Sequence, residues 1–257
     1  MKKFGLFLLC GCLFAMPARA FSVVHDFNVG IGPFDASHTQ FSYMLDDKDF
    51  QIKSAVETFG LFDALYPFKA AYETSGKILS DGLRTRSYHY QSQTRFNKRS
   101  KELVYDDKGN LLYRLSSKNG RKKKVGIAPD DENAGTTDFQ TVFAELARQY
   151  NKVRFCDSRM QVFDGKRRFD VIFKDEGREN LPPLENSPYA GPAAKCSMYI
   201  DKLKNDDDDM LMQISSERPI YFWLMEQNGK PFIARIRIDE TPLGALEAYA
   251  AKITIKE

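Results

Sequence analysis

The sequence contains few of the side chains that carry metal or nucleophilic chemistry. Its 257 residues include three histidines, His25, His38 and His89, four cysteines and one tryptophan. None of the histidines has the spacing of a metal-binding motif such as His-Glu-x-x-His. The Gly-x-Ser-x-Gly nucleophile elbow and the glycine-rich phosphate loop are also missing. The sequence therefore predicts a protein that is not an enzyme and that uses no cofactor.

Long apolar runs are missing as well. The one apolar segment, residues 4–16, is about a dozen residues long, whereas a transmembrane helix needs roughly twenty. It follows two lysines and precedes the small-x-small string at residues 18–20, which is typical of a secretory signal. We therefore expect residues 1–20 to be a cleaved signal peptide and residues 21–257 to form a single β-rich periplasmic domain.

A second reading of the N-terminus stays open. The string Leu-Cys-Gly-Cys at residues 9–12 is similar to a lipobox, and processing there would leave a lipid anchor on Cys12. In either case the mature chain is expected to have no transmembrane segment.

The mature chain has no excess of either charge. The whole sequence has 38 basic and 35 acidic residues, and Lys2, Lys3 and Arg19 belong to the expected signal peptide. Removing these three leaves 35 basic and 35 acidic residues. A balanced chain is a poor binder of nucleic acid by bulk charge, so we expect no nucleic-acid partner.

Only two cysteines remain after the expected cleavage, Cys156 and Cys196. An even number of cysteines in an oxidising compartment predicts a disulfide. The two residues have no zinc-ligand spacing and no nearby histidine. A loop of about 40 residues closed in this way would add roughly 3–4 kcal/mol to the free energy of unfolding.

Alternating polar and apolar segments dominate the mature chain, separated by turns rich in Asp, Asn and Gly. This pattern predicts an antiparallel β meander. One stretch with many prolines and glycines, residues 176–194, is expected to be a long loop. The expected strands are residues 41–50, 50–59, 72–79, 83–93, 101–105, 111–115, 122–127, 160–163, 168–173, 195–203, 210–215, 221–225 and 232–238.

One clear helix interrupts the strands. Residues 136–138, Thr-Thr-Asp, offer N-cap side chains, and apolar residues then recur at helical spacing to about Tyr150. A short helical piece is expected at residues 62–66, before a proline. Residues 243–255 stay ambiguous, because their Ala and Glu content favours a helix while their end alternates as a strand does.

Four ordered motifs resemble one family. The motifs are GLFDALYPFKAAYETSGKI (60–78), TDFQTVFAELARQ (137–149), VFDGKRRFDVIF (162–173) and RPIYFWLMEQNGKPFIARIRIDETPLG (218–244), with Cys196 before an aromatic strand. Together they resemble the bacterial exported family known as domain of unknown function 3108. Through this resemblance and the strand pattern we expect a mostly β fold, a curved antiparallel sheet or incompletely closed β-barrel around one main α-helix.

Two runs of basic residues are candidate contacts for anions. Residues 166–168 follow an Asp-Gly turn, and we interpret them as the solvated tip of a hairpin, with contact to lipid phosphate as the alternative. The second run leaves an Asn-Gly turn, and near an anionic membrane it would contribute roughly 1 kcal/mol per cation. This candidate anionic-surface contact consists of Arg121, Lys122, Lys123 and Lys124.

These observations favour a binding module over an enzyme. We expect a cell-envelope protein that holds a lipid, an acylated polypeptide or a partner peptide in the concavity of a half-barrel. The alternatives are a scaffold of an envelope protein complex and, with less support, a hydrolase of envelope polymers. A glycosidase would need two inward-facing carboxylates about 5–10 Å apart.

Overall fold

The protein is described by a computed structural model that covers residues 21–127, 135–164, 167–202, 214–241 and 243–256. Within these residues the chain forms fourteen strands and two helices. They are β1 (Phe21–Ile31), β2 (Phe34–Leu45), β3 (Asp49–Thr58), α1 (Gly60–Leu65), β4 (Phe68–Ile78), β5 (Leu83–Thr94), β6 (Lys98–Tyr105), β7 (Leu111–Lys118), β8 (Arg121–Gly126), α2 (Phe139–Val153), β9 (Ser158–Phe163), β10 (Arg168–Leu181), β11 (Gly191–Lys202), β12 (Ile220–Gln227), β13 (Lys230–Ile238) and β14 (Leu246–Lys256).

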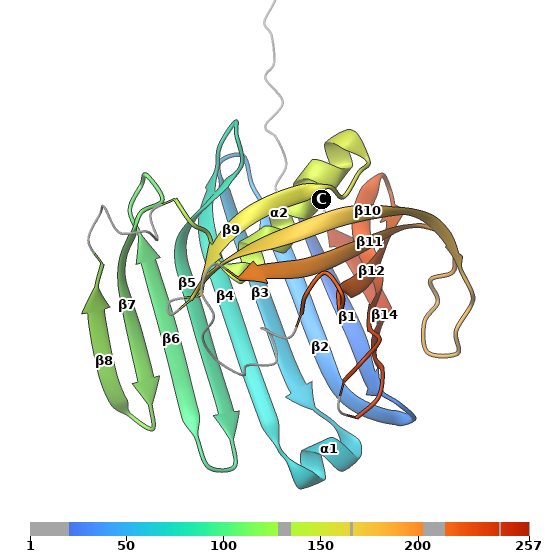
Figure 1. The fold of residues 1–257 in the computed structure, drawn as a ribbon, viewed down its shortest axis with the longest axis horizontal. Coiled ribbons are helices and arrows are strands. Elements are labelled where there is room, and N and C mark those ends of the chain that lie inside the picture. Colours follow the sequence, from blue (N-terminus) through green and yellow to red (C-terminus); the bar gives the residue numbers. More distant parts are fainter. Residues whose placement is uncertain (1–20, 128–134, 165–166, 203–213, 242, 257) are drawn as a thin grey trace, which may run out of the picture.

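All fourteen strands form one antiparallel sheet with the order β8-β7-β6-β5-β4-β3-β2-β1-β14-β13-β12-β11-β10-β9. Every neighbour pair is consecutive in sequence except β1 and β14, which join the two ends of the chain. The sheet curls so that β9–β12 pass in front of the broad sheet made by β1–β8, with α2 between them (Figure 1). The edge strands β8 and β9 do not pair, so the expected curved, incompletely closed architecture is confirmed.

Hairpin chemistry explains the tight turns between neighbouring strands. Asn119 and Gly120 connect β7 to β8 with φ angles of 50° and 84°. Asn228 and Gly229 connect β12 to β13 with φ angles of 54° and 72°. Two successive positive φ angles match the twist of paired strands, which is why Asn-Gly is favoured there.

The predicted helix forms and packs against the inner face of the curled sheet. Asp138 is its N-cap, and its carboxylate accepts hydrogen bonds from the backbone N–H groups of Gln140 and Thr141. The helix ends at Arg154, which adopts the left-handed conformation with φ of 61°. Its buried stripe belongs to a core cluster with β9–β13. That cluster includes Val142, Leu146, Tyr150, Phe169, Phe173 and Phe222.

The predicted disulfide joins Cys156 to Cys196, whose Cα atoms lie 6.1 Å apart. Cys156 follows α2 and Cys196 lies on β11, so the bond ties the end of the helix to the sheet. Both residues are fully buried in the α2 core cluster.

Two expectations about the strands were wrong or incomplete. Residues 176–194 are not one long loop, because β10 continues to Leu181 and β11 starts at Gly191. Gly177, which has a φ of 92°, lies within β10 in a bulge between Asp175 and Arg178. The sequence also predicted no strand before residue 41, whereas β1 and most of β2 lie there. Most of the strand expected at residues 210–215 lies outside the described residues.

The ambiguous C-terminal segment is a strand. Residues of β14 pair with β1 on one side and with β13 on the other. This pairing buries Ala248, Ala250 and Ile253. Tertiary burial therefore overrides the helix propensity of alanine.

Side chains bring the two ends of the open sheet together. Phe163 on β9 packs with Leu103 and Tyr105 of β6 and with Leu111 of β7. The backbone on the outer side of β9 also bonds to residue 137, since the Phe163 N–H donates to the Thr137 carbonyl over 3.0 Å. The barrel is thus closed at one point by apolar packing. Within the described residues, neither helix is long and apolar enough to cross a membrane.

Candidate ligand-binding hollow

The space that α2 leaves unfilled inside the curled sheet is a hollow of about 920 Å³. Its walls come from β1–β8 on one side and from α2, β13 and β14 on the other. Strand alternation places every second side chain of each strand toward it. Its apolar lining consists of Phe27, Val29, Phe41, Val56, Phe139, Phe143, Ile233, Ile236, Leu246 and Ala248.

Three tyrosines form one wall of this hollow. Tyr72 on β4 and Tyr90 on β5 are cross-strand partners whose ring centroids lie 4.8 Å apart. Burial raises the pKa of Tyr72 to about 12, with a smaller contribution from Tyr90. Tyr88 also lines the hollow, and burial is the main reason that its pKa is raised. The phenols are therefore neutral and offer hydroxyl groups within a largely apolar surface.

Basic side chains line the hollow beside the tyrosines, on β6, β7 and the edge strand β8. Arg99, Lys118 and Arg121 are successive cross-strand partners on β6, β7 and β8. Lys101, Ser116 and Lys123 form the next row. All of these residues line the hollow. We call the four side chains Arg99, Lys118, Arg121 and Lys123 the cationic wall.

The structure divides the predicted basic run between two faces. Arg121 and Lys123 line the hollow, whereas Lys122 and Lys124 alternate to the other face of β8. Lys124 lies over the ring of Tyr113 on that other face, 3.9 Å from its centroid. The run is therefore two separate pairs of cations and not one patch.

None of the four cations in the cationic wall forms an ion pair with an acidic residue that the structure describes. Asp164 is the one acidic residue among the described side chains around the hollow, and it is held by Arg167 at 2.6 Å. Burial works to raise the pKa of Asp164, but Lys101 and Arg167 outweigh it, and the pKa is lowered overall. The hollow therefore carries net positive charge at its β6–β8 side.

A buried polar network fixes α2 beside the hollow. The Asp138 carboxylate accepts hydrogen bonds from the Thr74 hydroxyl at 2.8 Å and from the Thr85 hydroxyl at 2.7 Å. The Thr141 hydroxyl donates to the same carboxylate at 2.5 Å. Gln140 reaches the Ser54 hydroxyl on β3 with a bond of 2.7 Å. Because β4 and β5 hold the helix N-terminus, Phe139 is fixed in the wall.

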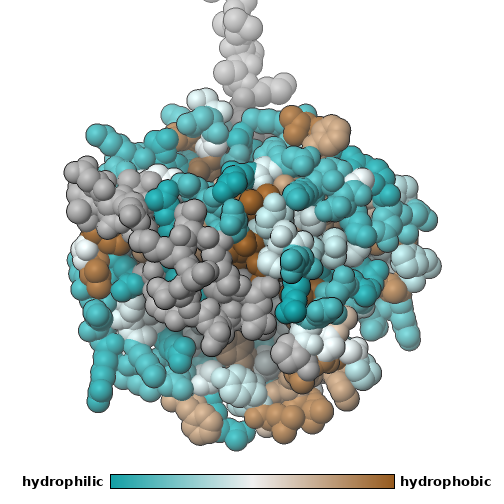
Figure 2. All heavy atoms as spheres, viewed as in Figure 1, coloured by the Kyte–Doolittle hydropathy of each residue, from teal (hydrophilic) through white to brown (hydrophobic). Residues whose placement is uncertain are grey.

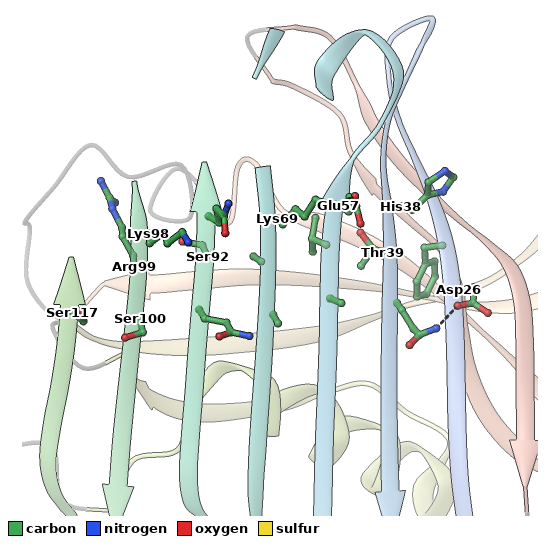
Figure 3. Close-up of a pocket in the computed structure, with 18 of the residues that line it drawn as sticks. Asp26, His38, Thr39, Glu57, Lys69, Ser92, Lys98, Arg99, Ser100 and Ser117 are labelled. Carbon is green, nitrogen blue, oxygen red and sulfur yellow. Dashed lines mark hydrogen bonds and ion pairs between the residues drawn. The ribbon is translucent and has the colours of Figure 1, made fainter. Parts of the chain in front are cut away.

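A second hollow, of about 910 Å³, has a polar lining and lies toward the end of the sheet where α1 is found. Its residues come from successive strands in rows across the sheet, from Asp26 on β1 to Ser117 on β7 (Figure 3). The Gln40 amide donates to Asp26 over 2.8 Å, and Lys69 pairs with Glu57. Rows such as Asp26, Gln40 and Ala55 alternate to the face of the sheet opposite the first hollow, so the residues that both hollows share belong to the sheet between them.

The other residues considered from the sequence serve the fold. In the basic run at residues 166–168, Arg167 binds Asp164 and Arg168 donates to Gln161 over 2.8 Å, as expected for a hairpin tip. Lys166 lies outside the described residues. Trp223 is buried, and its indole N–H donates to Glu179 over 3.1 Å. Within the described part of the chain, no group of histidine, cysteine and acidic residues could hold a metal ion.

The sequence did not predict the tyrosine wall or the place of Arg99 in the hollow. A usable signal was present, because Tyr88 and Tyr90 alternate in the strand that the sequence predicted at 83–93. Their facing partner, Tyr72, comes from the preceding strand. The contact to α2 could not be deduced, since it depends on how far the sheet curls.

Comparisons with known proteins identify a matching family and a solved structure with a similar fold. The sequence matches the family model described as a protein of unknown function (DUF3108) over residues 24–251. No curated protein matches the chain. The structure is similar to the crystal structure of a beta-barrel-like protein of domain of unknown function DUF1849 from Brucella abortus, with a TM-score of 0.53. That comparison covers 94% of this chain and 100% of the other at 10% identity, so it shows a likeness of fold alone.

Proposed function

The chain belongs to the DUF3108 family of unknown function, and from this premise and the geometry of the hollow we propose that it is a non-enzymatic protein of the periplasm that binds an anionic amphiphile. The ligand class comprises lipids and acylated polypeptides with a negatively charged head. The observation that carries the proposal is one hollow with an apolar lining on one side and, on the other, four cations that form no ion pair with a described acidic residue.

The apolar part of the hollow suits an alkyl chain. Ligand pockets usually have volumes of about 300–1,000 Å³ and mostly apolar walls with a few placed polar groups. The 920 Å³ hollow has this character, with Phe41, Phe143 and Ile236 among its lining residues. Each buried methylene group of a ligand would contribute about 0.8 kcal/mol.

The cationic wall suits the head of such a ligand. Arg99 and Arg121 are guanidinium groups, which bind phosphate and carboxylate oxygens through two parallel hydrogen bonds. Since no described carboxylate neutralises them, an anionic head would meet uncompensated positive charge at the exposed β6–β8 edge of the hollow.

Two further features support the non-enzymatic and periplasmic parts of the proposal. The described lining of the hollow contains the single carboxylate Asp164, whereas a glycosidase uses two. The buried Cys156–Cys196 disulfide is typical of proteins that fold in an oxidising compartment.

The test is a titration of the protein with lysophosphatidylglycerol, followed by calorimetry and native mass spectrometry. Val56→Trp would place a large side chain in the hollow, and Ala55→Trp would place the same side chain on the other face of β3. We expect Val56→Trp to weaken binding at least tenfold and Ala55→Trp to change it less than twofold. Absence of binding to the wild-type protein, or equal effects of the two variants, would refute the proposal.

A further inference from the structure

Exposed large apolar side chains gather at one end of the sheet. Eleven such residues are found in the described chain, and seven lie in or beside the connections β1–β2, β3–β4, β5–β6 and β13–β14. These connections share one end because the strands are antiparallel neighbours. The seven residues, which we call the turn rim, are Phe34, Phe59, Leu61, Leu65, Tyr66, Phe96 and Leu243.

The exposure of the rim is large and needs an explanation. Phe96 is 74% exposed and Leu65 is 71% exposed. Figure 2 shows hydrophobic side chains along the lower edge of the molecule, where Figure 1 places α1. Scattered apolar residues are normal on a protein surface, but their concentration at one end marks an interaction site.

Hydrogen bonds hold the rim connections in fixed positions. The Gly32 N–H donates to Ala245 over 3.0 Å, which joins the β1–β2 turn to the β13–β14 loop. The Phe59 N–H donates to Ala36 over 2.9 Å, which joins the start of α1 to β2. The Asn119 side chain accepts from the Lys98 N–H at 2.7 Å and so links the β5–β6 and β7–β8 turns. The apolar tips are therefore presented by an ordered frame.

Positive charge accompanies the rim on the β5–β8 side. The exposed cations at this end include Arg95, Lys98 and Lys122, together with Lys118 and Arg121 of the cationic wall. None of these five residues forms an ion pair with a described acidic residue. Within the described parts of the connections that carry the rim, the acidic residues include Asp35, Asp63, Asp239 and Glu240, which lie on β2, α1 and the β13–β14 loop, away from β5–β8.

We propose that the turn rim docks the protein on an anionic lipid surface. The apolar tips project from separate connections and do not form the walls of a groove, so they can enter a lipid interface without a partner of matching shape. Cations beside them would gain from a negative surface potential. Because Lys118 and Arg121 flank the β7–β8 turn, this docking brings the cationic side of the hollow toward the lipid. The inference goes beyond the proposed function, since it concerns a surface outside the hollow.

The test is sedimentation with vesicles of phosphatidylcholine containing one quarter phosphatidylglycerol. The protein and its variants are recovered from the periplasm of one expression host, so their N-termini are the same. The rim variant carries Leu61→Ser, Leu65→Ser and Phe96→Ser. The control variant carries Leu112→Ser, Val153→Ser and Phe155→Ser, which are exposed apolar residues away from the rim. We expect at least tenfold weaker vesicle binding for the rim variant and less than a twofold change for the control.

Further measurements distinguish docking on an anionic lipid surface from binding in the hollow and from self-association. Phe96→Ser alone, which leaves α1 unchanged, should weaken vesicle binding at least threefold. Pure phosphatidylcholine should bind the wild type at least fivefold less well. The rim variant should keep its affinity for soluble lysophosphatidylglycerol, so the rim and the hollow are tested separately. The proposal is overturned if the wild type ignores the vesicles, if rim and control variants bind equally, or if the rim variant changes self-association while vesicle binding stays intact.

Discussion

At the scale of the residue, His25 is a buried imidazole without a hydrogen-bond partner among the described residues. It is 2% exposed and lies among the rings of Phe27, Phe41, Tyr43 and Phe232, at centroid distances of 5.8 to 6.5 Å. Burial lowers its pKa from 6.5 to about 4, against smaller opposing effects of the nearby Phe41 backbone and of Asp26. The folded protein therefore binds its proton less readily than the unfolded chain does.

This histidine predicts a loss of stability in mild acid. Its contribution is present above the unfolded pKa of 6.5 and is lost as the pH falls toward the folded value of about 4. Between pH 7.5 and pH 5 the free energy of unfolding should fall by about 2 kcal/mol through this group alone. Urea denaturation at a series of pH values measures the fall.

The matched variant is His25→Leu, which should remove this pH dependence while keeping an apolar side chain in the same place. Carboxylates with lowered pKa, such as Asp164, lose their stabilising effect below about pH 4, outside this window. An unchanged slope between pH 7.5 and pH 5 in His25→Leu would show that another group is responsible.

The basic run at residues 121–124 is divided between two faces of β8, and paired substitutions can test the two faces separately. Arg99→Gln with Arg121→Gln removes two cations from the hollow, while Lys122→Gln with Lys124→Gln removes two from the other face. The first pair should weaken lysophosphatidylglycerol binding by at least tenfold, because hydrogen bonds to charged groups contribute about 1.5–3 kcal/mol each. The second pair should change it less than threefold, and calorimetry at fixed ionic strength compares them.

Equal losses from the two pairs would mean that the cations act through general attraction and not through contact with the head of the ligand. Added salt is a second check, since attraction over a long distance is screened more strongly than a direct contact.

At the scale of the element, the N-terminus of α2 depends on one buried carboxylate. Asp138→Ala would leave the hydroxyls of Thr74, Thr85 and Thr141 without their shared acceptor and would remove the helix cap. A lost cap costs about 0.5–2 kcal/mol, and each unsatisfied buried donor adds about 1–3 kcal/mol. We expect the free energy of unfolding to fall by about 3–5 kcal/mol, as measured by urea denaturation.

The control for this variant is Asp157→Ala, an exposed aspartate shortly after the same helix. It should change the free energy of unfolding by less than about 0.5 kcal/mol. A small effect of Asp138→Ala would show that the threonine hydroxyls find other acceptors, such as one another, after the carboxylate is gone.

The elements differ in how far the sequence could predict them. The helix could be predicted because its N-cap and its apolar spacing are both local features, within Asp138 to Tyr150. The hairpins with Asn-Gly or Asp-Gly turns were readable for the same reason. Strands β1 and β14 were missed or ambiguous because they are neighbours of one another across the whole chain, with Phe27 opposite Ala250. Their stability comes from that distant pairing, which no local pattern records.

At the scale of the whole molecule, the sequence predicted an open, curved sheet but not the hollow within it. The aromatic and alternating strands indicate a sheet, and the single amphipathic helix must cover part of one face. How much of that face stays uncovered depends on the position of α2 relative to β4 and β5. The cationic wall then follows from register, which aligns Arg99, Lys118 and Arg121 across three strands.

Phe163 packs β9 against β6 and β7 across the open seam, where β8 and β9 share no hydrogen bonds and Lys101 also donates to the Asp164 carbonyl. Phe163→Ala should lower the free energy of unfolding by about 3 kcal/mol through the loss of a buried aromatic ring. Its distinctive effect should be regional: amide hydrogen exchange should accelerate in β6 and β7, which lose their contact with β9, more than in β10–β12. Phe155→Ala, at an exposed phenylalanine, is the matched control and should accelerate neither region.

The rate at which a ligand leaves the hollow tests the role of Phe163 in function. The strands that carry the cationic wall adjoin the Leu103 and Leu111 contacts of Phe163, so loosening those contacts should widen the β6–β8 side of the hollow. Lysophosphatidylglycerol should then leave Phe163→Ala at least threefold faster than the wild type, as measured by stopped-flow displacement. Uniform acceleration of hydrogen exchange with an unchanged dissociation rate would mean that Phe163 stabilises the core without holding the barrel closed.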